Sequence, residues 1–156
     1  MIYVHIPFCK QKCSYCNFHF STSFNFKEEM IASIKREIFL RKDELSVNAL
    51  SSLYFGGGTP SLLTVDELQS LTDEVLKYFS FNSNIEITLE AYPDDLNENF
   101  LKALSGTNIN RLSIGTQTFS DEDLKMMNRA HNASEAESSI KRAQDFGFEN
   151  ISIDLI

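Results

Sequence analysis

The sequence predicts an α/β fold built on a parallel β-sheet, and three observations lead to this prediction. Short apolar runs alternate along the chain with longer segments whose apolar residues recur at helical spacing. This strand–helix unit occurs about four times and is followed by a fifth strand, which implies right-handed crossovers between parallel strands. The 156 residues, of which 42% are hydrophobic, suffice for one core and one domain. A barrel-type (β/α) sheet and a doubly wound open sheet both agree with this alternation.

Five short segments are predicted to be strands because their apolar residues form compact runs bounded by turn residues. The first leads into a loop with three cysteines, and the second stops at three consecutive glycines. The last is rich in isoleucine and leucine, which is typical of a buried strand, and no helical segment follows it. Because a natural domain rarely stops at such a strand, we expect a longer parent protein. The predicted strands are residues 2–6, 50–55, 85–91, 111–116 and 150–156.

Apolar spacing and capping residues predict the helices between these strands. Apolar residues recur at helical spacing through residues 27–42. Thr64 followed by Glu67 forms a capping-box pattern, which predicts the start of the second helix. The remaining signals are a segment over 97–104 that ends at Gly106, a helix start at Ser120 with Asp123, and a helix end at Gly147.

Composition and charge exclude several classes of protein. The net charge is −8 and no long basic run occurs, so we expect no nucleic-acid partner, because phosphate neutralisation supplies most of that affinity. No apolar run is long enough to span a bilayer, and the N-terminus lacks the features of a signal peptide, so we expect a cytoplasmic protein without a transmembrane segment. Lys10 and Lys12 are expected to be solvated.

Unusual residues lie within or just after each of the five predicted strands. In parallel (β/α) sheets, ligands bind at the carboxyl edge of the strands, where successive loops converge. We therefore expect a binding site at this edge. Its predicted contributors are the loop with the cysteines (residues 9–16, the cysteine loop), the glycines at 56–58, Glu90, Gln117 and Asp154.

The cysteine loop carries all three cysteines, Cys9, Cys13 and Cys16, which argues against a disulfide scaffold and for a metal or redox site. Three thiolates can hold three irons of a cubane and leave the fourth iron open to an outside ligand. One alternative is a zinc site completed by His19 or His5, because three cysteines and one histidine are a common zinc set. A redox-active dithiol is a second alternative.

Two carboxylates, Glu90 and Asp154, lie in otherwise apolar strands, where a carboxylate needs a partner. Ribose hydroxyls or an amine are suitable partners for Glu90. The alternative is a structural salt bridge, with Arg111 or Arg129 as the cation. The glycines before Thr59 would let the backbone approach a ligand closely, whereas an ordinary turn is the alternative.

Six motifs follow one another along the whole chain in the order of a known family. They resemble the radical S-adenosylmethionine (SAM) branch that contains oxygen-independent coproporphyrinogen III oxidase and the heme chaperone HemW. The motifs are YVHIPFCKQKCSYCNF at 3–18, YFGGGTPS at 54–61, ITLEAYPDDL at 87–96, RLSIGTQTF at 111–119, NRAH at 128–131 and ISIDLI at 151–156.

This resemblance implies a partial (β/α) barrel of the radical SAM type, of which residues 1–156 would be the N-terminal portion, ending before a sixth strand and a C-terminal domain. It also implies a [4Fe–4S] cluster on Cys9, Cys13 and Cys16, an electron donor that reduces the cluster, and SAM as the second cofactor. In the family, SAM cleavage yields a 5′-deoxyadenosyl radical that abstracts hydrogen from the substrate. The SAM contacts carried over by motif are Tyr3, Tyr15, Gly57, Gly58, Thr59, Glu90, Gln117, Arg129 and Asp154.

Two departures from the oxidase favour the HemW-like subgroup. The oxidase usually has a fourth cysteine where this chain has Phe18, and it has an N-terminal extension before the first strand. In the subgroup, heme binding and transfer to client proteins is the proposed role. An active coproporphyrinogen III oxidase and a zinc-bearing (β/α) binding domain are the alternatives. Tyr92 stands where the subgroup often has Asn.

Overall fold

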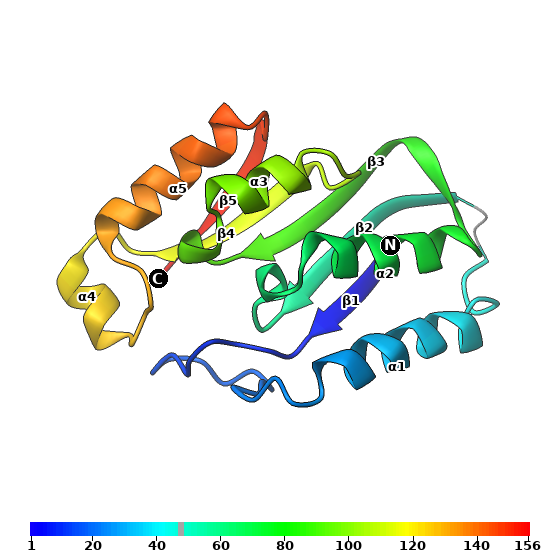
Figure 1. The fold of residues 1–156 in the computed structure, drawn as a ribbon, viewed down its shortest axis with the longest axis horizontal. Coiled ribbons are helices and arrows are strands. Elements are labelled where there is room, and N and C mark those ends of the chain that lie inside the picture. Colours follow the sequence, from blue (N-terminus) through cyan, green and yellow to red (C-terminus); the bar gives the residue numbers. More distant parts are fainter. Residues whose placement is uncertain (47–48) are drawn as a thin grey trace.

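The computed structural model describes residues 1–46 and 49–156 and shows one five-stranded parallel sheet (Figure 1). The strand order is β1-β2-β3-β4-β5, so every strand lies beside its predecessor in the chain. This order excludes the doubly wound alternative, in which the strand order reverses at a switch point. In the described residues the sheet does not close, so the fold is a partial barrel. The strands are β1 (Ile2–Ile6), β2 (Ala49–Gly57), β3 (Ser80–Ala91), β4 (Arg111–Gln117) and β5 (Asn150–Leu155).

The helices lie where spacing and caps predict them. Thr64 Oγ1 accepts from the Glu67 N–H at 3.1 Å and the Glu67 carboxylate accepts from the Thr64 N–H at 2.7 Å, which confirms the capping box. A second box, Asn132 with Glu135, begins α5 and was not predicted. No helix in the described part of the chain has the length and apolar character to cross a membrane. The helices are α1 (Lys27–Leu40), η1 (Pro60–Leu62), α2 (Val65–Leu76), η2 (Pro93–Asp95), α3 (Glu98–Leu104), α4 (Asp121–Met126) and α5 (Ala133–Asp145).

One face of the sheet carries the hydrophobic core. Alternate residues of the strands point to this face, and α1, α2, α3 and α5 contribute apolar side chains to the same cluster. Along this layer α1 contacts α2, and α2 contacts α3. The core residues of the strands include Val4, Ile6, Leu53, Phe55, Ile87, Leu89, Leu112 and Ile114.

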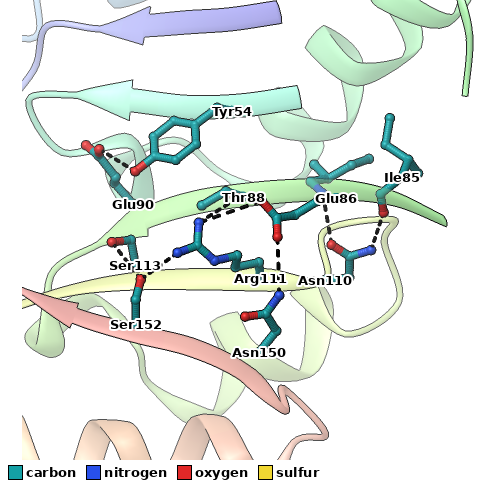
Figure 2. Close-up of polar contacts among 11 residues, drawn as sticks. Tyr54, Ile85, Glu86, Thr88, Glu90, Asn110, Arg111, Ser113, Asn150 and Ser152 are labelled. Carbon is teal, nitrogen blue, oxygen red and sulfur yellow. Dashed lines mark hydrogen bonds and ion pairs between the residues drawn. The ribbon is translucent and has the colours of Figure 1, made fainter. Parts of the chain in front are cut away.

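The opposite face of the sheet is polar, which the apolar strand pattern did not predict. Glu90 lies beside Ser113 in the ladder, and Ser113 lies beside Ser152. Arg111 donates from Nη2 to Ser152 Oγ at 3.1 Å and from Nη1 to Thr88 Oγ1 at 3.4 Å (Figure 2). Parallel sheets are normally apolar on both faces. We therefore infer that, within the described residues, the polar face of this sheet does not pack against other elements and serves another function.

The strand β5 forms as predicted, but it is not buried. Ile153 is 38% exposed and Leu155 is 61% exposed, and Asp154 is exposed as well. Among the described residues only β4 pairs with β5, so β5 is an edge strand and only Ile151 packs against the core. Asp154 is therefore an exposed carboxylate in this part of the protein, and its bonding role stays a prediction.

The turn into β4 provides a stability test. Asn110 Oδ1 accepts from the Ile87 N–H at 2.9 Å and Asn110 Nδ2 donates to the Ile85 carbonyl at 2.7 Å, so this side chain extends the ladder of β3 (Figure 2). We expect Asn110→Ala to lower the free energy of unfolding by about 1–2 kcal/mol, because two backbone groups lose their partner. Denaturant unfolding measures this change.

Asn150→Ala is the matched control, since its Nδ2 makes one long contact of 3.4 Å with Glu86 on the surface. This control should change the unfolding free energy by less than about 0.5 kcal/mol. Equal stability of Asn110→Ala and the unsubstituted protein would show that the side-chain bridge contributes nothing.

Candidate functional site

A cavity of about 500 Å³ opens at the carboxyl ends of the strands and unites almost all of the predicted site residues. Tyr3 is the exception, because it lines a separate cavity beside α1 and its hydroxyl lies 3.4 Å from His5 Nδ1. The predicted residues on the main cavity are Cys9, Cys13, Tyr15, Cys16, Gly57, Gly58, Thr59, Glu90, Gln117, Arg129 and Asp154.

The cysteine loop is attached on one side to η2. Lys10 is exposed, as expected, but it also forms ion pairs with Asp94 and Asp95, which were not predicted. Asp95 also accepts from Ser61 Oγ at 2.6 Å. Burial raises the pKa of Asp95, and the hydrogen bonds from Lys10 and Ser61 oppose that rise by stabilising the carboxylate. The lysine therefore connects the loop to a buried polar group.

On its other side the cysteine loop is attached to the end of α4. The Ser14 N–H donates to the Met127 carbonyl at 3.0 Å, and Gln11 Nε2 donates to the Asn128 carbonyl at 2.5 Å. Asn128 has φ 55° and donates from Nδ2 to the Lys12 carbonyl at 2.7 Å. Figure 1 shows this loop and α4 lying together beyond the carboxyl ends of the strands. Segments between 84 and 117 residues further along the chain thus hold the loop from two sides.

Hydrogen-bond donors lie against two of the three sulfur atoms. The Thr59 hydroxyl donates to Cys9 Sγ at 3.5 Å, and Arg129 Nη1 donates to Cys13 Sγ at 3.4 Å. Burial raises the pKa of the Cys9 thiol, and the Thr59 hydrogen bond opposes this. In the residues that the structure describes, no three His, Cys, Asp or Glu side chains are gathered tightly enough to form a metal site. The donor set itself, three thiols on one cavity with hydrogen bonds directed at sulfur, has the chemistry of thiolate ligands.

The histidines do not complete this set. His5 and His19 line the separate cavity beside α1, and neither is among the residues that line the cavity with the thiols. His131 is buried and its Nε2 lies 3.1 Å from the Thr116 carbonyl, which is a structural contact. The geometry therefore gives no support to a zinc site completed by His5 or His19.

The three glycines let β2 pass close to the chain's own residues. Gly57 has φ +115°, and a Cβ there would lie 2.7 Å from the His5 ring. A Cβ at Gly58 would lie 2.7 Å from the Phe8 carbonyl oxygen and 3.0 Å from Cys9 Sγ. Neither position tolerates a side chain without a shift of its neighbours, so these glycines fix the distance between β2 and the cysteine loop.

Glu90 is held by hydrogen bonds rather than by a salt bridge. Tyr54 Oη donates to Glu90 Oε1 at 2.8 Å (Figure 2), and the Gly57 N–H donates to Oε2 at 3.0 Å. Burial raises the pKa of Glu90, and these two hydrogen bonds oppose the rise. Arg111 lies nearest to Glu86 instead, at 3.8 Å, so the predicted alternative of an Arg–Glu90 pair was wrong for Arg111.

Arg129 lies against Cys13 and forms no pair with Glu90 either. It donates from Nη2 to the Gly115 carbonyl at 2.6 Å and from Nη1 to the Tyr15 hydroxyl at 3.3 Å. Its guanidinium carbon lies 3.9 Å from the centre of the Tyr92 ring. Within the described residues, Arg129 Nε is buried and has no hydrogen-bond partner. Burial raises the pKa of Tyr15 to about 12.

Gln117 ends β4 in a left-handed conformation, with φ 69°, and is buried on the cavity wall. A non-glycine residue with positive φ is uncommon and often marks a functional position. Its carbonyl accepts from the Ile156 N–H at 2.9 Å. This conformation turns the chain sharply where the predicted contact residue lies.

Sequence reasoning missed three residues of this site. The ion pairs of Lys10 were not predicted, Tyr92 had no assigned role, and Tyr54 was not singled out. Alternation along β2 could have found Tyr54, because it lies on the same face of the sheet as Glu90. The partners of Lys10 and Tyr92 lie far away in sequence, and no local pattern reveals them.

Comparison with known proteins shows the family of this chain. The profile of the radical SAM superfamily matches residues 3–156. Heme chaperone HemW of Haemophilus influenzae is 35% identical over 99% of this chain and 42% of its own length. Heme chaperone HemW of Bacillus subtilis is 36% identical over 99% of this chain and 41% of its own length.

A solved structure, the radical SAM enzyme coproporphyrinogen III oxidase (HemN) of Escherichia coli, matches with a TM-score of 0.88 at 30% identity. The match covers 99% of this chain and 36% of that chain. The chain thus spans about two fifths of the length of the HemW relatives named above. Since the superfamily profile and these relatives cover nearly every residue, the chain belongs to the radical SAM superfamily.

Proposed function

We propose that this protein is a HemW-like heme chaperone that holds a [4Fe–4S] cluster and SAM in the cavity at the carboxyl ends of the strands. The observation that carries the proposal is the convergence of three thiols, Glu90 and Arg129 on one cavity. Two HemW proteins, each more than 30% identical over almost the whole chain, support the heme-related role. The proposal includes a cytoplasmic location, an electron donor and heme-accepting client proteins.

The cavity has charges that suit SAM. Arg129 offers a cation with a free Nε to a carboxylate, and Glu90 and Asp154 offer carboxylates to an amine or to ribose hydroxyls. Cys9, Cys13 and Cys16 would hold the cluster, with Thr59 and Arg129 donating to two of the sulfurs. When bound, the reduced cluster supplies one electron to SAM. The residues of the chain orient both groups and limit access of water.

An active coproporphyrinogen III oxidase is the second candidate, and the TM-score of 0.88 with HemN favours it. Phe18 favours the chaperone, because it occupies the expected position of the oxidase's fourth cysteine, offers no ligand atom and is 75% exposed.

A direct assay separates these two functions. The anaerobically reconstituted protein is incubated with heme, then with the apo-form of a heme-dependent enzyme, and heme absorption and enzyme activation are followed. We expect heme binding and transfer. Decarboxylation of coproporphyrinogen III in the presence of SAM and a one-electron reductant, without heme transfer, would instead support the oxidase.

The cysteines provide the first test of the cluster. Cys9→Ser, Cys13→Ser and Cys16→Ser should each abolish bound iron and the broad absorption band near 400 nm, because the chain has only three cysteines. His19→Ala is the control and should keep its iron, since His19 lines the separate cavity. Loss of metal from His19→Ala would show that the cluster assignment is wrong.

Glu90 provides the test of the SAM site. Glu90→Gln should weaken SAM binding about ten- to a hundred-fold, the effect of losing one charge-assisted hydrogen bond. Iron content should not change, because Glu90 lies on the sheet and outside the cysteine loop. Titration calorimetry measures the affinity, and Glu86→Gln, on the same strand but outside the cavity lining, is the matched control. If Glu90→Gln binds SAM as tightly as this control, the assignment of Glu90 does not hold.

The attachment of the cysteine loop through Lys10 provides a further test. Lys10→Met removes both ion pairs and leaves Asp95 buried beside Ser61 alone, so the loop should hold its cluster less firmly. We expect iron to be released to a chelator about tenfold faster than from the unsubstituted protein. Lys12→Met, in the same loop and exposed, should release iron at the original rate. Identical rates for both variants would contradict the anchoring role.

A further inference from the structure

Tyr92 lines the cavity and contacts the protein through its backbone and its ring. It lies directly after β3, and its N–H donates to Ser61 Oγ at 3.2 Å. The Arg129 guanidinium lies against the ring at 3.9 Å, in the range of a cation–π contact. Arg129 is itself only 9% exposed and is held by the Gly115 carbonyl. The backbone of Tyr92 and one face of its ring are therefore both in contact with the protein.

This arrangement places the Tyr92 hydroxyl 3.7 Å from Cys13 Sγ. A phenol is protonated near neutral pH and can donate, whereas a thiolate that ligates iron has no proton and can only accept. Arg129 Nη1 approaches the same sulfur at 3.4 Å, and the Tyr15 side chain bonds to it as well, so Cys13 faces more donors than Cys9, which accepts from the Thr59 hydroxyl. The environment of the three sulfurs is thus unequal.

We infer that Tyr92 is a positioning residue that donates a hydrogen bond to the Cys13 thiolate and raises the reduction potential of the cluster. The inference rests on the proposed function, because it requires the cluster. Hydrogen bonds to the sulfurs are one of the determinants of iron–sulfur potentials. Reduction adds one electron and one negative charge to the cluster, and a donor at a ligating sulfur stabilises that charge.

The alternative role for Tyr92 is packing. The contributions of its ring and of its hydroxyl group can be tested separately. The ring stacks on Arg129 and the hydroxyl reaches the sulfur. Tyr92→Phe keeps the ring and removes only the hydroxyl, so a packing role predicts no change in potential. A hydrogen-bonding role predicts a lower potential with the fold and the iron content preserved.

The test is a redox titration of the anaerobically reconstituted protein without SAM. Dithionite is the one-electron donor, and the reduced cluster is followed by electron paramagnetic resonance. For Tyr92→Phe we expect the equilibrium constant for reduction to fall about tenfold, equivalent to about 59 mV for a one-electron step. Tyr78→Phe is the matched control, because its hydroxyl contacts Glu74 at 3.2 Å on α2, outside the cavity lining.

Each outcome has a distinct meaning. A lower potential in Tyr92→Phe with normal iron content, and an unchanged potential in Tyr78→Phe, would support the inference. An unchanged potential in Tyr92→Phe would overturn it and leave the proposed function intact. Loss of iron from Tyr92→Phe would also overturn it, because the hydroxyl would then be needed for assembly of the cluster. A protein without iron before any substitution would instead overturn the proposed function.

Discussion

Each strand from β1 to β4 is followed by a right-handed crossover that leads to the next strand in sequence. These crossovers place the helices on one face of the sheet, and the site depends on this placement. The helical face takes the hydrophobic core, so the opposite face is free to carry Arg111, Glu90 and the serines beside them. Since all strands run in one direction, their carboxyl ends meet at one edge. The thiols, the glycines and Arg129 come from separate segments of the chain and line one cavity for this reason.

The cysteine loop itself has little means of holding its shape. Cys9 and Cys13 are buried, but most residues between them are polar, so the loop cannot be ordered by apolar burial alone. The ion pairs of Lys10 on one side and the hydrogen bonds to Asn128 on the other replace that missing core. An organised loop reduces the entropy lost when ligands must converge on a cluster, which is the physical advantage of attaching it before the cluster binds.

Local sequence patterns predicted the fold well, because strands, helix caps and helix ends at glycine are each determined by a few neighbouring residues. The capping box at Thr64 and the end of α5 at Gly147 are examples, and the cysteine spacing located the candidate site. The exposure of β5 depends on what packs against the strand, which its own residues do not specify. The role of Lys10 was missed for the same reason, since its partners lie about eighty residues away.

Charged groups that line the cavity lack some of the hydrogen-bond and ion-pair partners that they need within the described part of the protein. This lack of partners indicates that the cavity binds a ligand. Arg129 is buried with its Nε unpaired among the described residues, and no ion pair there joins Glu90 to a Lys or Arg. Burial of a charged group without full compensation costs free energy. If Glu90 and Arg129 only stabilised the fold, we would expect these two opposite charges to form an ion pair with each other. Instead, Glu90 accepts a hydrogen bond from Tyr54, and Arg129 donates one to the Gly115 carbonyl. The fold keeps them apart across a cavity of about 500 Å³, where a ligand that carries both charges can reach both.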